Sequence, residues 1–194
     1  MGRLILQMMI SMDGMVSGPK GELDWIAHDK EIEQGHLDRL EDAEVMIIGA
    51  GLYPEMPRFW RSAAADENAE AIPSAIGHAM NKLKMIVYSH KDIPADQSND
   101  EVHIVTTDEA FTSDIQRLKE ETRGTIITYG GVRFARSLLQ QDLVDELHLD
   151  VCPVILGEGQ PLFTDLKHRT QLRVIKVTSH ASGTTEMHYE VVKD

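Results

Sequence analysis

The stretch "TIITYGGVRFARSLL", residues Thr125–Leu139, decides the fold. It passes from an apolar run through two adjacent glycines into apolar residues at helical spacing. This order predicts a buried strand, a turn at Gly130-Gly131 and a helix that begins at Val132. The glycines have two interpretations: a tight strand-to-helix connection, or open backbone at a helix N-terminus that holds a phosphate. The local pattern does not choose between them.

The same alternation of apolar runs and helical patterns extends through most of the chain. Buried strands are expected at Arg3–Ile10, Glu44–Gly49, Lys84–Ser89, Val102–Thr106 and Thr125–Tyr129. Helices are expected at His28–Leu40, Pro73–Leu83, Asp114–Thr122 and Val132–Gln140, and a polar surface excursion at Arg61–Asn68. Strict alternation from Leu147 onward, and again over Gln171–His180 and Thr184–Val192, predicts antiparallel strands. The order predicts a single α/β domain over residues 1–194, with three layers and a mostly parallel sheet that ends in antiparallel C-terminal strands.

Composition limits the classes of partner. The chain has 194 residues and a formal net charge of −13, with no basic stripe, which argues against nucleic acid or an anionic membrane. The apolar runs are too short to span a bilayer, and the N-terminal run is expected to be the first strand rather than a signal peptide. A single cysteine, Cys152, suits a reducing compartment, so a cytoplasmic location is expected.

Several motifs offer chemistry beside a structural alternative. The "GAG" at Gly49–Gly51 lacks a third glycine and is followed by Pro54, which disfavours a Rossmann motif. His148, Asp150 and Cys152 alternate along one strand, where a mixed polar face is expected rather than a metal site. The first long loop contains Asp13, Asp24 and Trp25. A carboxyl group beside an indole could serve as a proton donor next to a flat wall that binds a ring. The alternative is a surface loop that is anchored by one buried tryptophan.

The ordered series of motifs is more specific than any single one. It consists of "ISMDGMVSGPKGELDWI" (10–26), "MIIGAGLYPEM" (46–56), "IVYSHK" (86–91) and "ITYGGVRFARSLLQQDLVDELHLDVCPVILGEGQPLF" (127–163). Together they resemble the dihydrofolate-reductase-like superfamily, and specifically the reductase domain of the bifunctional riboflavin-biosynthesis deaminase–reductase and its stand-alone relatives. The resemblance implies NADPH binding across the strand ends, hydride transfer to a pterin-like or pyrimidine-like heterocycle, and a homodimer.

The resemblance also assigns residues to roles. Asp13, Asp24 and Trp25 fall on the substrate side, as candidates for the proton donor and the ring wall. The cofactor side comprises three segments, at the second strand end, at the "SH" and at the double glycine. Its residues are Gly49, Ala50, Leu52, Tyr53, Ser89, His90, Gly130, Gly131, Val132, Arg133 and Phe134. No metal is implied.

The chain departs from the pattern of this family at the cofactor side. The usual G-R-x-T reads Gly49-Ala50-Gly51-Leu52 here, so the arginine and the threonine are missing, and His90 stands where an arginine is common. Tyr129 replaces the acidic residue before the glycines. Three outcomes stay open: NADPH held through Lys91, Arg58 or Arg133, the use of NADH, or a site that has drifted. The rival function is therefore a non-catalytic dimeric binding or scaffold protein that kept the fold.

Overall fold

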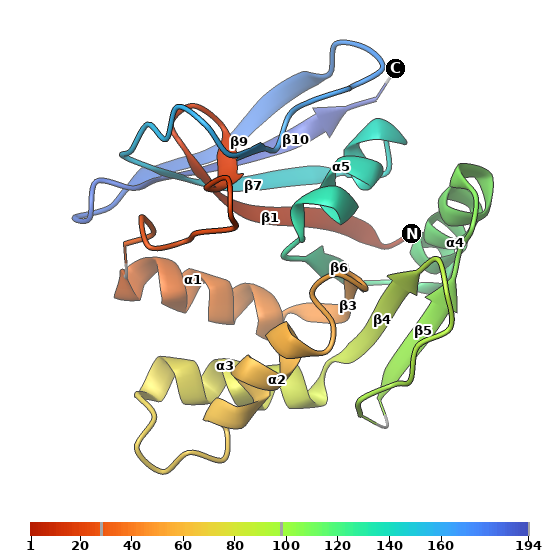
Figure 1. Cartoon of the computed structure of the whole chain (residues 1–194), viewed down its shortest axis with the longest axis horizontal. Helices are drawn as coiled ribbons and strands as arrows, with labels where there is room; N and C mark the ends of the chain where they lie inside the picture. Colours follow the sequence, from red (N-terminus) through yellow and green to blue (C-terminus); the bar gives the residue numbers. More distant parts are fainter. Residues whose placement is uncertain (28, 98, 194) are drawn as a thin grey trace.

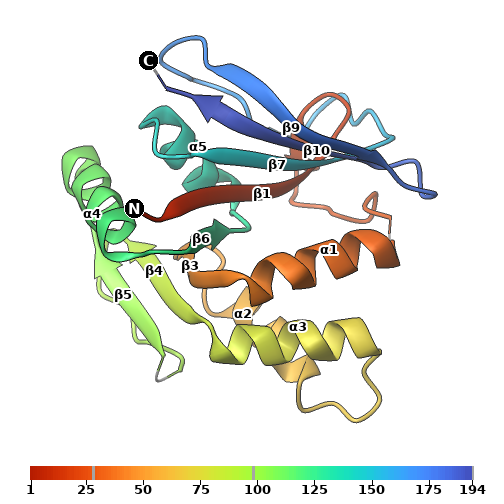
Figure 2. The same cartoon turned by 180° about the vertical axis from the view of Figure 1, so that it is seen from behind.

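The computed structural model describes residues 1–27, 29–97 and 99–193, and its centre is a sheet of eight strands (Figures 1 and 2). Their order is β5 (Asp100–Ile104), β4 (Lys84–Ser89), β3 (Ala43–Gly49), β6 (Thr125–Thr128), β1 (Arg3–Ser11), β7 (Glu146–Cys152), β10 (Thr185–Val192) and β9 (Gln171–Ser179). The first six strands pair in parallel. β10 runs antiparallel to β7, and β9 runs antiparallel to β10. A separate pair joins β2 (Met15–Ser17) to β8 (Gln160–Pro161).

Helices cover both faces of the sheet and make three layers. On one face lie α1 (Lys30–Glu41), α2 (Glu55–Ala63) and α3 (Ala71–Lys82), and on the other lie α4 (Asp108–Glu121) and α5 (Val132–Gln140) (Figure 1). β3 shows how one strand serves both layers. Val45 and Ile47 join the core under α4 and α5, whereas Met46 and Ile48 join the core over α1 and α3. The near-continuous apolar run of this strand follows from that double burial.

The expected fold class is confirmed, because the sheet is mostly parallel and closes with antiparallel C-terminal strands. The start of α4 differs most from the expected boundaries. α4 begins at Asp108, six residues before the expected start, because the Thr107 side chain caps it by accepting the Ala110 N–H at 3.2 Å. β5 begins at Asp100 rather than Val102. The expected helix start at His28 lies outside the described residues.

Arg61 corrects one expectation about the surface. The polar segment that follows the second strand was expected to be exposed, but α2 runs to Ala63 and buries the Arg61 side chain. Its guanidinium donates to both carboxylate oxygens of Asp100, at 2.6 and 2.9 Å. This bidentate pair ties α2 to the outermost parallel strand. Arginine in a polar sequence segment gave no sign of that burial.

The parallel strands end at a common edge, which is where ligands collect in folds of this type. The segments after β1, β3, β4, β6 and β7 all leave from this edge, and they carry the residues predicted from the sequence. No helix among the described residues is long and apolar enough to cross a membrane.

Candidate functional site

The turn between β6 and α5 requires its first glycine for structural reasons. Gly130 has a φ of +93°, which side chains other than glycine rarely adopt. A Cβ on Gly130 would lie 2.8 Å from the Met8 Sδ. Its N–H donates to the Thr128 hydroxyl at 3.3 Å, and the Gly130–Gly131 peptide bond is cis. Gly130 therefore fixes the direction in which the chain enters α5.

The second glycine leaves the helix N-terminus open. Gly131 is the N-cap of α5, has a φ of −51° and makes no capping bond with a side chain. The first helical bond runs from the Ala135 N–H to the Gly131 carbonyl at 2.9 Å, so the N–H groups of Val132, Arg133 and Phe134 precede it. Free N–H groups and the positive end of the helix dipole together favour an anion at this point.

The segment after β3 has a different character. A Cβ on Gly49 would lie 2.8 Å from the Cβ of Phe134, so this glycine permits close packing of α5 on the sheet. The Phe134 ring stacks on Tyr88, with centroids 5.7 Å apart, and meets Phe111 edge-on. Gly49 and the Phe134 side chain therefore pack between sheet and helix, and the predicted contact of these residues with a cofactor stays a prediction for their backbone atoms.

Tyr53 also has a structural role that the sequence did not reveal. Its side chain is buried, its hydroxyl donates to the Asp100 carboxylate at 3.0 Å, and it accepts the Asp96 N–H. Burial raises the pKa of the Tyr53 hydroxyl. The Tyr53 hydroxyl is therefore engaged within the fold, and a contact of this residue with a cofactor stays a prediction. Ala50 and Leu52 remain half-buried between these anchored residues, at the strand-end edge.

The two residues of the "SH" motif at the end of β4 have different environments. Ser89 is buried, and its hydroxyl donates to the Lys91 carbonyl at 2.6 Å and accepts the Lys91 N–H at 3.2 Å. His90 is exposed, and its Nδ1 donates to the Val105 carbonyl at 2.7 Å. The Ser89 hydroxyl is thus occupied in a local turn, while the His90 ring is oriented with its Nε2 away from that carbonyl.

The three basic residues expected to replace the missing arginine are not equivalent. Arg58 already pairs with the Asp96 carboxylate, which lowers the pKa of Asp96. Lys91 and Arg133 are exposed, and neither makes an ion pair with the residues that the structure describes. Arg133 follows directly after the first α5 residue, so it is the one beside the open helix N-terminus.

Asp13 is held as a carboxylate by the first loop. It accepts bonds from the Ser11 hydroxyl at 2.6 Å, the Gly157 N–H at 2.8 Å and the Leu156 N–H at 3.1 Å. These donors, led by Ser11, lower the pKa of Asp13 from 3.8 to about 2. Such a group is ionised at neutral pH, which argues against its predicted role as proton donor. It pins the 155–158 segment to the end of β1 instead.

The other two predicted loop residues lie in the exposed part of the same loop. Asp24 is exposed, and Trp25 is half-buried with its Nε1 donating to the Glu22 carbonyl at 3.1 Å. The bond is local, so it orders the loop without tying the indole to the sheet.

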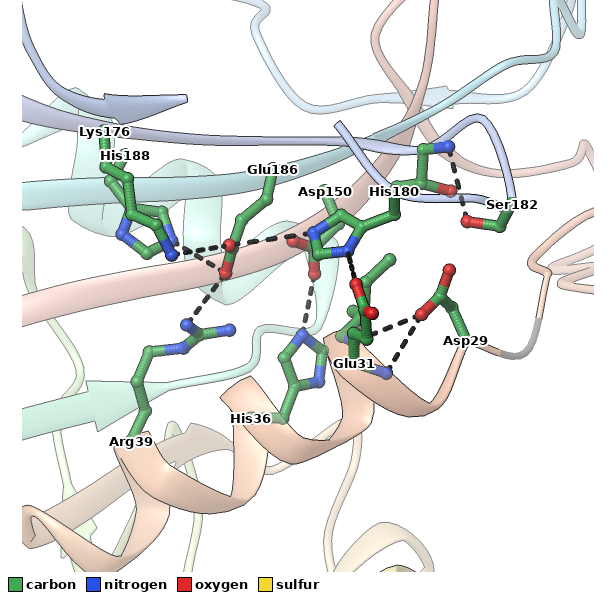
Figure 3. A network of polar contacts seen from close by, with 12 residues as sticks. Asp29, Glu31, His36, Arg39, Asp150, Lys176, His180, Ser182, Glu186 and His188 are labelled. Atoms are coloured by element: carbon green, nitrogen blue, oxygen red, sulfur yellow. Dashed lines mark hydrogen bonds and ion pairs between the residues drawn. The ribbon is translucent and has the colours of Figure 1, made fainter. Parts of the chain in front are cut away.

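A network of polar side chains lies between α1 and the sheet, near the ends of β1 and β7 (Figure 3). His36 on α1 donates from Nε2 to the Asp150 carboxylate at 2.7 Å. Gln7 on β1 donates to the same carboxylate oxygen at 2.8 Å. Tyr129, at the end of β6, donates its hydroxyl to the His36 carbonyl at 3.2 Å. These residues are brought together from four separate segments.

A second part of the network surrounds Glu186 on β10. Its carboxylate pairs with Arg39 and His188, both at 3.0 Å, and with Lys176 at 3.3 Å (Figure 3). These contacts lower the pKa of Glu186, and the hydrogen bond from His188 is the largest cause. The His188 ring stacks flat on His148 of β7, with centroids 3.7 Å apart. Burial, followed by the neighbouring His188 and Arg39, lowers the pKa of His148 from 6.5 to about 3.

The alternating His148, Asp150 and Cys152 do not converge as metal ligands. His148 bonds the Glu146 carboxylate at 2.9 Å, whereas Asp150 bonds His36 and Gln7. A different group, Asp29, Glu31 and His180, does place its ligand atoms within 4.8 Å of one another. Asp29 is already engaged there as the N-cap of α1, where its carboxylate accepts the Glu31 N–H at 3.0 Å. Helix capping accounts for that carboxylate.

A family model for the RibD C-terminal domain matches residues 3–186. The chain belongs to the RibD C-terminal domain family. Among curated proteins it is similar to the uncharacterised protein YyaP of Bacillus subtilis (strain 168), with 26% identity over 187 residues, 96% of this chain and 94% of YyaP. The suspected family is therefore confirmed.

Solved structures share the RibD-type fold over the whole chain. A candidate riboflavin biosynthesis protein from Shewanella sp. PV-4 superposes with a TM-score of 0.72 and 18% identity, covering 100% of both chains. A deaminase/5-amino-6-(5-phosphoribosylamino)uracil reductase from Thermotoga maritima gives 0.68 and 13%, covering 98% of this chain and 57% of that one. Dihydrofolate reductase from Enterococcus faecalis gives 0.60 and 12%, covering 99% and 98%. The dihydrofolate-reductase-like fold is thereby shown.

The network around Asp150 is the part of this RibD-type domain that sequence reasoning missed. His36 lies in a segment that the sequence predicted only as a helix, and Asp150 was predicted only as one residue of an alternating strand. One signal was present: Gln7 is a polar residue inside the buried run "RLILQMMI", where an amide needs a partner. The partner itself lies 143 residues away along the chain, which local patterns do not reach.

Proposed function

We propose that this chain is an NADPH-dependent reductase that transfers a hydride to a pterin-like or pyrimidine-like heterocycle, of the 5-amino-6-(5-phosphoribosylamino)uracil type. The observation that carries the proposal is the open N-terminus of α5 behind Gly130-Gly131. It lies at the C-terminal edge of a parallel sheet, with N–H groups that precede the first helical bond. The family and the printed reductase names of structural relatives support the same class.

The residues present fit the pyrophosphate of a dinucleotide, whereas the segment Gly49–Leu52 carries no basic group for a 2′-phosphate. Val132, Arg133 and Phe134 offer backbone N–H groups to the pyrophosphate, and a Cβ on Gly131 would intrude next to them, 3.3 Å from the Leu52 Cγ. At the segment after β3, Ala50 offers no charge to a 2′-phosphate. His90, Lys91 and Arg133 are the exposed basic side chains left for that group, and NADH is the alternative cofactor.

When bound, the nicotinamide supplies the hydride, and the protein positions the two rings and controls the proton. The half-buried Trp25 provides a flat wall on the side of the first loop. The proton reaches the substrate from water or from Asp24, because Asp13 keeps its carboxylate ionised under the three donors described above.

The rival proposal is a non-catalytic binding or scaffold protein. The observation that favours it is the segment Gly49–Leu52, whose neighbours are fixed by packing and which carries no basic group. A titration of the full chain with NADPH and with NADH, followed by nicotinamide fluorescence, separates the two proposals. Micromolar binding of either cofactor supports the reductase. Millimolar or weaker binding of both, by a chain that melts cooperatively, supports the rival.

We further propose that the chain works as a homodimer in the cytoplasm. The strand β9 lies at the open edge of the sheet, and Val174, Ile175 and Val177 are half exposed or more on it. An apolar edge strand of this length is a hazard unless another chain covers it. Light scattering at micromolar concentration is expected to give about twice the chain mass of 21.8 kDa, and a monomer contradicts the proposal.

A further inference from the structure

A mostly apolar cavity of about 270 Å³ lies between the C-terminal end of α5, the sheet and the segment 163–170, which joins β8 to β9. Its lining includes Leu139 of α5, Leu147 of β7, Leu172 of β9, Val191 of β10 and Phe163 of that segment. Leu147 is the second residue of its strand, so the cavity lies where the parallel strands begin. The segments predicted to bind the cofactor leave from the opposite edge of the sheet.

One end of this cavity is closed and the other is open to solvent. Leu147 is 1% exposed and forms part of the closed end, whereas Phe163 keeps 43% of its surface exposed at the mouth. A smaller cavity, of about 150 Å³ with leucine, isoleucine and phenylalanine walls, stays dry and binds benzene. The space beside Leu147 therefore suits an apolar group larger than one benzene ring, because its walls offer water few hydrogen bonds.

Three ionisable side chains also line the cavity, namely Asp142, His168 and Arg169. His168 Nε2 pairs with the Asp142 carboxylate at 3.2 Å, so these two groups partner each other. The Arg169 side chain is exposed and makes no ion pair with any residue that the structure describes. A guanidinium binds a carboxylate through two parallel hydrogen bonds, so an unpaired arginine beside an apolar space fits a ligand with an acidic end.

The charges around the cavity favour a ligand with a single negative charge. Asp142 lies on the same rim and the whole chain has a net charge of −13, so a second negative charge would be repelled. The cavity also exists without a ligand, because the segment 163–170 is held against the turn after α5. Its two contacts there are the His168–Asp142 pair and the bond from Lys167 Nζ to Gln141 Oε1 at 2.9 Å. Binding therefore loses little free energy to ordering the chain.

We propose that this cavity binds a small monocarboxylic acid, whose apolar tail fills the space beside Leu147 and whose carboxylate pairs with Arg169. The inference goes beyond the proposed function, because it concerns a second site at the other edge of the sheet. It holds or fails independently of NADPH binding. Burial of the tail gives the larger part of the affinity, and the pair with Arg169 gives the preference for an acid over a neutral ligand.

The test titrates the full chain with two probes of one shape and follows the methyl signals of its leucines and valines by NMR. Phenylbutanoate carries a terminal ring, a short carbon chain and a carboxylate, and phenylbutanamide has a neutral amide in place of the carboxylate. The acid is expected to bind with a dissociation constant of about 0.1–1 mM and to shift the signals of Leu139, Leu147 and Val191. It is expected to bind about threefold to tenfold more tightly than the amide, because the charge pair lies at an exposed rim.

Two variants separate the charge from the cavity. Arg169→Gln is expected to remove the preference for the acid and to leave the affinity of the amide unchanged. Val191→Phe is expected to fill the cavity and to weaken the binding of both probes at least about tenfold. The matched control is Arg173→Gln, which removes an exposed arginine of β9 that pairs with Glu190 and does not line the cavity. It is expected to keep the affinities of the wild type. If Val191→Phe does not fold, Leu166→Phe carries the same comparison, because the half-buried Leu166 lines the cavity from the segment 163–170.

The outcomes that overturn the proposal are distinct. Methyl signals that do not shift up to about 10 mM probe overturn the site, and so do equal affinities of the wild type for acid and amide. A preference that survives Arg169→Gln, or that falls as far in Arg173→Gln, overturns the pairing with Arg169. A lower dimer mass of Val191→Phe in light scattering, with no probe bound by the wild type, assigns the cavity to a second copy of this chain instead. Shifts around the cavity, a preference lost in Arg169→Gln alone and weak binding by the filled variant support the proposal, whatever the NADPH titration gives.

Discussion

Two glycine-containing segments leave neighbouring strands at the same edge of the sheet, yet the space beside each glycine is filled differently. A Cβ on Gly49 would meet the Cβ of Phe134 at 2.8 Å, an atom fixed to the backbone of α5. A Cβ on Gly131 would meet the Leu52 Cγ at 3.3 Å, on a side chain that can rotate. The first glycine serves packing, and the second leaves room beside open backbone.

The helices that follow differ in the same sense. In the first turn of α2, Pro54 and Pro57 have no N–H group, and the Met56 N–H donates to the Leu52 carbonyl at 3.0 Å. In α5 the first three residues all carry N–H groups ahead of the first helical bond. A glycine after a strand therefore indicates an anion site only when the next helix still has donors to offer.

The largest expected effect is on Gly131. Gly131→Val is expected to weaken nucleotide binding at least about a hundredfold, because a branched side chain would occupy the approach to the α5 N–H groups. Its φ of −51° is allowed for valine, so the fold should remain cooperative. Nicotinamide fluorescence and a thermal melt check both parts. Equal affinity in wild type and variant would reduce this turn to a structural connection.

A smaller effect is expected at Gly49, and on stability instead of binding. Gly49→Ala should destabilise the fold by about 1–3 kcal/mol through overpacking against Phe134. Nucleotide affinity per folded molecule should not change. Urea unfolding measures the first quantity, and the double variant Gly49→Ala with Phe134→Ala should show coupling between the two sites. Additive effects would mean that the two residues do not share this space.

The smallest effect is expected from restoring a charge between the two segments. Ala50→Arg should strengthen NADPH binding more than NADH binding, because the cofactors differ only by the 2′-phosphate. A charge-assisted pair contributes about 1.5–3 kcal/mol, and ordering the side chain offsets about 0.5–1.5 kcal/mol. The net gain is about fivefold to thirtyfold in affinity. Ala50→Gln, similar in length but uncharged, is the control.

The ratio of NADPH affinity to NADH affinity, measured at low and at moderate salt, tests the prediction for Ala50→Arg. A gain that shrinks as salt rises would place the new guanidinium in solvent beside the phosphate. A ratio identical in wild type, Ala50→Gln and Ala50→Arg would show that Ala50 does not face the 2′-phosphate. The rival non-catalytic function would then gain support.

The sequence predicted the elements well wherever periodicity was strong, as in β1, β3, β4 and α5. It also located the double glycine at the open helix end. It did not show how the Tyr53 and Phe134 side chains pack, because a motif gives the position of a residue but not the direction of its side chain. Tyr53 turns toward Asp100 on another strand, and Phe134 turns into an aromatic cluster.

The network around Asp150 was beyond local reasoning for a related reason. Its members come from β1, α1, the β6 end and β7, and their meeting depends on strand order. Parallel pairing of β1 with β7 places Met9 opposite Asp150, and the Gln7 to Asp150 bond spans 143 positions. Contacts between residues so far apart along the chain leave no trace in a periodic pattern. Gln7, a polar residue inside an apolar run of β1, was the sequence signal that a partner existed.

The stacked rings of His148 and His188 have a consequence for the tolerance of this protein to acid. In the folded chain the pKa of His148 is lowered to about 3, chiefly by burial, whereas an unfolded histidine titrates near 6.5. Between those values the unfolded state binds the extra proton, so stability falls as the pH drops below about 6.5. The slope from this residue alone reaches up to about 1.4 kcal/mol per pH unit. Mild acidification below about pH 6.5 is therefore expected to lower the free energy of unfolding of the whole chain.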